Sequence, residues 1–199
     1  MNVRRRVLLG LAALAMPFGA AMSSEPVHVV KFINFSCAVC RAAEALDGPI
    51  RELTESRGGR FVIAPLPRGM NEARERFYYA LRELGPEVEA QVRLSLYRGA
   101  QDFNYPLADV PQTLDWLQMD LQVPGIDWAR ILAEVNGAGP AAAVERAVQL
   151  ALRAGLQVVP TYVLVQGDRV LATLDPKSVP GGELPALREA VLTALRNAH

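Results

Sequence analysis

The sequence predicts an α/β fold in which a strand, a helix and a second strand precede a long helical stretch, and two strands and a helix close the chain. Val27 to Phe35 is β-branched, aromatic and almost continuously apolar, as in a central strand covered on both faces. Phe61 to Leu66 is a second apolar strand pattern after Gly58-Gly59. This order favours parallel pairing of the two strands through a right-handed crossover.

A helix is expected to begin at Ser36 and Cys37, directly after the first strand. Its apolar residues recur at spacings of four and three, which places them on one helical face: Val39, Ala43, Leu46, Ile50 and Leu53. Gly48-Pro49 interrupts this pattern, and we expect a kink there. The two cysteines of the chain therefore lie at a strand-to-helix junction.

The chain from Glu72 to Ala154 is predicted to be helical. Its expected breaks stand at glycine and proline positions, namely Gly85-Pro86, Gly99, Pro124-Gly125 and Gly139-Pro140. After this stretch come two further strands and a closing helix, over Thr161 to Gln166, Arg169 to Leu174 and Leu184 to Asn197.

The first 24 residues have the three-part layout of a secretory signal peptide. Arg4, Arg5 and Arg6 precede the apolar stretch 7–15, and small residues follow at 19–21. The apolar stretch is shorter than the roughly 20 residues that span a bilayer, so we do not expect a membrane span. Arg4-Arg5 also admits a twin-arginine signal, but we favour ordinary secretion. The mature protein is then exported, to the periplasm.

Composition limits the possible partners of the mature chain. Of 199 residues, 51% are hydrophobic and 21% are charged, which suits one globular domain with a substantial core. Removal of three arginines leaves 18 basic against 21 acidic residues, a net charge of −3. Nothing in this balance indicates nucleic acid as a partner.

Cys37-Ala38-Val39-Cys40 is the motif that carries chemistry. A cysteine at a helix N-terminus meets unpaired backbone N–H groups and the positive end of the helix dipole, which favour thiolate over thiol. Cys37 is then the attacking sulfur and Cys40 the resolving one. The motif alone also fits half of a metal site or an inert bridge. Because the chain has just two histidines, His28 and His199, four-coordinate zinc is disfavoured.

A second feature is Val159-Pro160-Thr161, where a proline stands immediately before an apolar strand and denies it a backbone donor. With the Cys37 to Cys40 motif, this loop resembles the thioredoxin superfamily, in which a cis-proline packs against the two cysteines and nearby backbone groups pair with substrate. The long helical stretch between motif and loop resembles DsbA proteins, which carry an inserted helical domain. The resemblance implies a thioredoxin fold with a helical insertion.

Four segments follow from this resemblance. We expect a signal peptide, a first part of the thioredoxin fold, the inserted helical domain and a second part of the thioredoxin fold, over residues 1–24, 25–70, 71–154 and 155–199.

Three departures from the DsbA pattern bear on redox tuning. Ala38 and Val39 replace the usual Pro-His pair, and Ser36 replaces an aromatic residue and is expected to cap the helix. Lys31 stands where the superfamily commonly keeps a buried acid. If Lys31 is charged beneath the cysteines, it stabilises a thiolate and makes the pair more oxidising. The alternative is a strand lysine that snorkels to solvent.

The resemblance implies dithiol-disulfide exchange on exported cysteine-containing polypeptides, with oxidase as the leading direction. Such an enzyme needs no cofactor beyond its redox-active Cys37-Cys40 disulfide, and a redox partner regenerates it. Isomerase or reductase activity uses the same site. An exported metal-binding module using the two thiolates, or a structural protein with an inert bridge, belongs to a different class.

Overall fold

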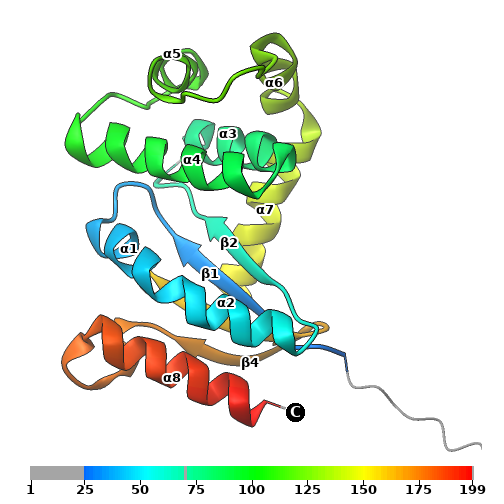
Figure 1. The fold of residues 1–199 in the computed structure, drawn as a ribbon, viewed down its shortest axis with the longest axis vertical. Helices are drawn as coiled ribbons and strands as arrows, with labels where there is room; N and C mark the ends of the chain where they lie inside the picture. Colours follow the sequence, from blue (N-terminus) through cyan, green and yellow to red (C-terminus); the bar gives the residue numbers. More distant parts are fainter. Residues whose placement is uncertain (1–24, 70, 199) are drawn as a thin grey trace, which may run out of the picture.

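The structure is a computed structural model that describes residues 25–69 and 71–198, so the predicted signal peptide lies outside the described residues. Its centre is a four-stranded sheet in the order β2-β1-β3-β4 (Figure 1). The strands are β1 (His28–Ile33), β2 (Phe61–Pro65), β3 (Thr161–Gln166) and β4 (Arg169–Leu174). β1 pairs with β2 in parallel, as predicted, and the other two pairings are antiparallel.

β1 lies in the middle of the sheet, and its side chains are correspondingly buried. Phe32 and Ile33 have no exposed surface. The register places Lys31 of β1 opposite Ile63 of β2 on one side and Tyr162 of β3 on the other. A lysine at this position has no short path to solvent.

The first helical segment is divided differently from the prediction. It comprises α1 (Ala38–Ala42), the 3₁₀ turn η1 (Ala43–Leu46) and α2 (Asp47–Ser56). The break therefore precedes Gly48-Pro49, and the predicted kink there is wrong, because Pro49 sits in the first turn of α2, where a backbone N–H is not needed. Val39 is 48% exposed and does not belong to the buried stripe.

Helices cover the sheet on both faces. Figure 1 shows α1 and α2 in front of the sheet and α7 behind it, with α8 packed beside α2 and β4. α8 spans Leu184–Asn197, as the sequence predicted. In the described part of the chain, no helix is both long and apolar enough to cross a membrane.

The described residues between β2 and β3 are mainly helical, as predicted. They form α3 (Ala73–Leu81), η2 (Arg82–Leu84), α4 (Pro86–Tyr97), η3 (Arg98–Asp102), α5 (Val110–Asp120), α6 (Trp128–Val135) and α7 (Ala138–Arg153). Figure 1 shows α3 to α6 gathered at one edge of the molecule, above the sheet. Because α7 also packs on β2, it ties this insertion to the sheet.

Two of the predicted breaks take another form. Gly139 and Pro140 fall within the first turn of α7 and do not separate two helices. Gly99 lies in the π-helical turn η3, which continues directly from α4. A Cβ at Gly99 would stand 2.8 Å from the Trp116 indole, so close packing explains this glycine.

Candidate active site

Cys37 caps α1 with its own sulfur. Its backbone is extended, with φ −95° and ψ 106°, and its Sγ accepts a hydrogen bond from the Cys40 backbone N–H at 3.1 Å. The turn that leads into it is held by Asn34, whose Oδ1 accepts from the Ser36 N–H at 2.9 Å and whose carbonyl accepts from the Cys37 N–H at 3.0 Å. The unpaired N–H groups of a helix start are thus directed at a sulfur.

Ser36 does not cap the helix, so that prediction is wrong. Its Oγ accepts a hydrogen bond from Arg74 Nη1 at 2.9 Å, because the turn before α1 directs the serine toward α3. Arg74 is 9% exposed. The insertion therefore contacts the residue that immediately precedes the first cysteine.

The two sulfurs differ in exposure and in acidity. Cys37 is partly exposed, whereas Cys40 is fully buried. A hydrogen bond from the Cys40 thiol lowers the pKa of Cys37 to about 6, and the backbone N–H groups of Cys40 and Val39 and the charge of Lys31 act in the same direction, against the effect of burial. The same thiol donation, together with burial, raises the pKa of Cys40. Cys37 is therefore a thiolate at neutral pH, while Cys40 keeps its proton.

The proline loop lies against Cys37. The Val159–Pro160 peptide bond is cis, as the resemblance implied. Cys37 Sγ is 3.6 Å from the Val159 carbonyl oxygen. Among the described residues, the Val159 N–H donates no hydrogen bond within the protein. Two segments far apart in the sequence thus place the Cys37 sulfur beside Val159, whose backbone N–H is free to bond to a client backbone.

Thr161 holds the proline loop from its buried side. Its side chain is fully buried, and its Oγ1 donates to the Val158 carbonyl at 2.6 Å. Thr161 is the first residue of β3, so its hydroxyl points back into the loop. It therefore holds the shape of the loop and does not line a client groove.

Lys31 lies in a buried ion pair on β1. Its side chain has no exposed surface, and its Nζ is 2.7 Å from Asp47 Oδ2 and 3.7 Å from Glu44 Oε1. Asp47 Oδ1 also accepts from the Tyr162 hydroxyl at 2.9 Å. The snorkelling alternative is excluded by this burial. The charge of Lys31 lowers the pKa of both cysteines.

Asp47 and Tyr162 are site residues that the sequence reasoning missed. Asp47 is the first residue of α2 and Tyr162 the second of β3, and no motif links either to Lys31. Burial raises the pKa of Asp47, although the Lys31 ammonium opposes this shift. The Lys31 ammonium is thus paired with Asp47, which Tyr162 holds from a distant part of the chain.

Partly buried ion pairs continue from this site into the insertion. Glu44 of η1 accepts from Arg93 Nε of α4 at 2.8 Å, and Arg93 Nη1 donates to Glu89 at 3.4 Å. Glu89 accepts in turn from the Tyr78 hydroxyl of α3. This chain of charged contacts connects the layer below the cysteines with α3 and α4.

A groove of about 410 Å³ opens beside Cys37. Its walls are the turn after β1, the loop after β2 and the loop before β3, and its lining residues are Asn34, Ser36, Cys37, Leu66, Pro67, Arg68, Leu156, Gln157, Val158 and Val159. Ala38 and Val39 are exposed and stand outside this lining. An extended chain that reaches Cys37 along the groove meets mainly apolar side chains.

The described residues contain no group of three or more His, Cys, Asp or Glu side chains that could hold a metal ion. The acidic residues near Cys40 are instead engaged by Lys31 and Arg93.

Solved structures of other proteins share the fold of this chain. No protein-family model and no curated protein matches the sequence. A variant of the Pseudomonas aeruginosa DsbA is 22% identical, with a TM-score of 0.68, over 93% of this chain and 95% of that one. The Proteus mirabilis DsbA is 16% identical, with a TM-score of 0.65, over 85% of this chain and 88% of that one. The chain therefore has the DsbA-like thioredoxin fold with a helical insertion.

Proposed function

We propose that this chain is an exported thiol-disulfide oxidoreductase that introduces disulfides into exported cysteine-containing polypeptides. The observation that supports this most directly is the position of Cys37. A sulfur with its pKa lowered to about 6 caps a helix, lies 3.6 Å from the Val159 carbonyl and is backed by a buried thiol at Cys40. Such a dyad carries out dithiol-disulfide exchange without a metal or an organic cofactor.

The proposed reaction starts from the Cys37-Cys40 disulfide. A client thiolate attacks the Cys37 sulfur, the bond between the two cysteines breaks, and its electron pair goes to the Cys40 sulfur, which takes up a proton. A second client thiolate then attacks the client sulfur of the mixed disulfide and releases Cys37 as a thiolate. The client loses two electrons and two protons, and the enzyme becomes a dithiol. A redox partner reoxidises it.

The free backbone N–H of Val159 can bind the backbone of a client polypeptide. A client backbone lying along residues 157–159 adds as a strand beside this loop, with its cysteine directed at Cys37. The Proteus mirabilis DsbA has been solved with the non-covalently bound peptide Pro-Trp-Ala-Thr-Cys-Asp-Ser. Because the groove walls are mainly apolar, we expect clients in an unfolded or extended state.

The oxidase direction is supported by the low pKa of Cys37. A stabilised thiolate favours the reduced dithiol, which makes the disulfide form the stronger oxidant. Lys31 takes part in this tuning, since its charge lowers the pKa of both cysteines. An isomerase or a reductase of the same fold has a more negative potential, and an exported metal-binding module instead binds a thiophilic metal at both thiolates.

One set of variants tests this function. The purified mature chain should oxidise a reduced, unfolded disulfide protein, and Cys37→Ser should abolish the activity. Cys40→Ser, given a client that already contains a disulfide, should accumulate a mixed disulfide, because the Cys37 thiolate attacks the client disulfide and no second thiol releases it. A measured reduction potential near that of strong oxidants, about −120 mV, supports the oxidase, and one near −270 mV indicates a reductase. Catalysed exchange that survives Cys37→Ser would overturn the proposal. Secretion of a reporter fused to residues 1–24 tests export.

A further inference from the structure

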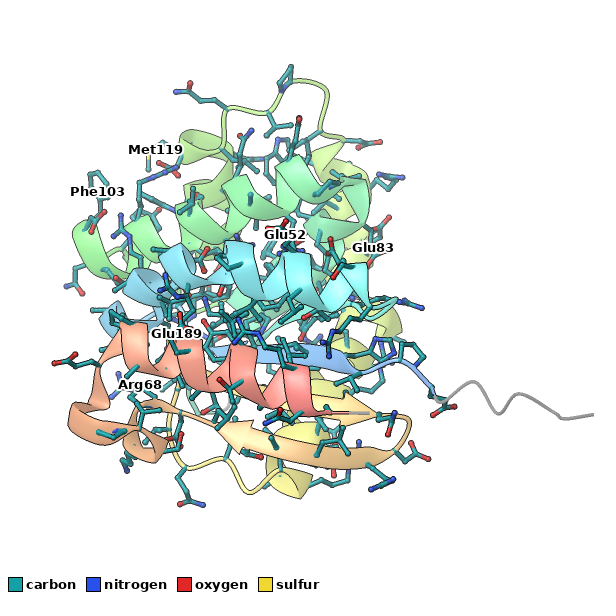
Figure 2. The ribbon with its side chains drawn as sticks, turned by 60° about the horizontal axis from the view of Figure 1, so that its bottom comes forward. Glu52, Arg68, Glu83, Phe103, Met119 and Glu189 are labelled. Atoms are coloured by element: carbon teal, nitrogen blue, oxygen red, sulfur yellow. The ribbon has the colours of Figure 1, made fainter. Side chains whose placement is uncertain are left out.

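The groove beside Cys37 carries one charged side chain, Arg68. It belongs to the loop that follows β2, where Figure 2 labels it, and its side chain is exposed. The other groups that line the groove are neutral apart from the reactive Cys37 sulfur, and no acidic residue is among them. A cation at a mainly apolar groove without acidic residues favours a ligand with a negative charge.

The neutral polar side chains of the groove already form hydrogen bonds within the protein. Asn34 donates to the Leu66 carbonyl at 2.9 Å and accepts from the Ser36 N–H at 2.9 Å. Ser36 Oγ accepts from Arg74, and Gln157 Nε2 donates to the Gly155 carbonyl at 3.3 Å. Specific recognition of a client side chain therefore falls to a group with unused donors.

Arg68 is such a group. Among the described residues it takes part in no ion pair. Arg41, in α1, is paired with Asp102 at 2.7 Å, and Arg74 donates to Ser36. Of these three arginines close to Cys37, Arg68 thus has its guanidinium donors available to a bound polypeptide.

We propose that the groove selects client segments with an aspartate or glutamate close to the reacting cysteine, and that Arg68 determines this specificity. The inference rests on the proposed exchange function and names its substrate class. A client extends about 3.3 Å per residue, and Cys37 and Arg68 line the same groove, so an acidic residue a few positions from the client cysteine reaches the guanidinium. Arg68 binds and orients the client and takes no part in bond exchange.

The expected size of the preference follows from the exposure of Arg68. An exposed ion pair changes an equilibrium or a rate by roughly two- to fivefold and is screened by salt. At the rim of an interface such a charge acts mainly on the association rate. The preference should therefore appear in kcat/KM at low ionic strength and fade at high salt, with kcat almost unchanged.

The test compares short cysteine peptides that carry glutamate, glutamine or lysine at each of the two positions on either side of the cysteine. We expect the wild-type protein to exchange with at least one glutamate peptide about threefold faster in kcat/KM than with its glutamine counterpart. Arg68→Gln should remove this ratio, and Arg68→Glu should reverse it in favour of lysine. Arg60→Gln, at the opposite end of β2, is the matched control and should keep the wild-type ratio.

The outcomes separate this inference from the function on which it rests. Equal exchange of glutamate, glutamine and lysine peptides by the wild-type protein would overturn the specificity and leave the exchange function standing. A glutamate preference that persists in Arg68→Gln would overturn the assignment to Arg68. Failure to exchange with every peptide would overturn the proposed function itself, and the inference with it.

Discussion

Among residues 25–69 and 71–198, two charged side chains are completely buried, one in the sheet and one in the insertion, and the structure surrounds them differently. Lys31 of β1 has Asp47 Oδ2 at 2.7 Å and Glu44 nearby. Glu75 of α3 in the insertion has no hydrogen-bond partner for either carboxylate oxygen, and Arg74 Nε stands 4.0 Å away. The first charge is compensated by its neighbours and the second is not.

The sheet and the insertion accommodate a buried charged side chain in different ways. Burial raises the pKa of Glu75 to about 7, and Arg74 opposes this shift without cancelling it. The carboxyl therefore takes up a proton as the pH falls below about 7, and burial of its neutral form costs much less. The charge of Lys31 is kept by an ion pair, whereas the buried carboxylate of Glu75 is only weakly compensated and becomes protonated near neutral pH.

Breaking the compensated pair should have the largest effect. Asp47→Ala leaves the Lys31 ammonium buried without its nearest partner, and we expect a loss of about 3 to 5 kcal/mol in the free energy of unfolding, measured by urea denaturation. The double variant Lys31→Met with Asp47→Leu removes both charges and should lose much less. A single variant no less stable than the double one would contradict the view that the pair compensates a buried charge.

Removing the uncompensated charge should instead stabilise the protein in a pH-dependent way. The native pKa of Glu75 lies above that of an unfolded glutamate, so its folded state binds the extra proton and loses stability as pH rises from about 4.5 to 7. We expect Glu75→Gln to gain about 3 kcal/mol at pH 8 and almost nothing at pH 4, measured by denaturation at both values. An equal gain at both pH values would show that packing, and not charge, sets the cost.

The smallest expected effect concerns redox tuning by Lys31. Lys31→Met removes the cation beneath the sulfurs, so the pKa of Cys37 should rise and the reduction potential should become more negative, by roughly 10 to 30 mV. Thiolate absorbance against pH and equilibration with a glutathione buffer give the two quantities. Lys177→Met, at the exposed second lysine of the chain, is the control. An unchanged potential in Lys31→Met would end the tuning hypothesis.

Sequence patterns predicted the strands, the closing helix and the helical character of the insertion, because each depends on a local apolar period. They were wrong about the helix that carries the cysteines. The 3₁₀ turn η1 changes the helical phase between α1 and α2, so Val39 turns to solvent although its spacing from Ala43 fits one stripe. Spacing alone does not reveal where a helix tightens.

On the surface of the insertion, too, the sequence pattern does not predict which apolar side chains are exposed. Phe103 and Met119 are each 64% exposed, and Figure 2 shows both at the outer edge of the helical layer. Their apolar character gives no sign of this exposure, because it depends on how η3 and α5 pack on their neighbours. An apolar residue is a sound indicator of burial only where several share one face.

The sequence by itself determined the reactive pair Cys37 and Cys40, its place between a strand and a helix, and the proline before β3, because these are short-range patterns. The tertiary structure decided what surrounds the pair. The Lys31, Asp47 and Tyr162 contacts join β1, α2 and β3, and the Arg68 groove joins three loops. Such contacts depend on sheet register and helix packing, which bring together residues that are distant in the chain and unrelated by any local period.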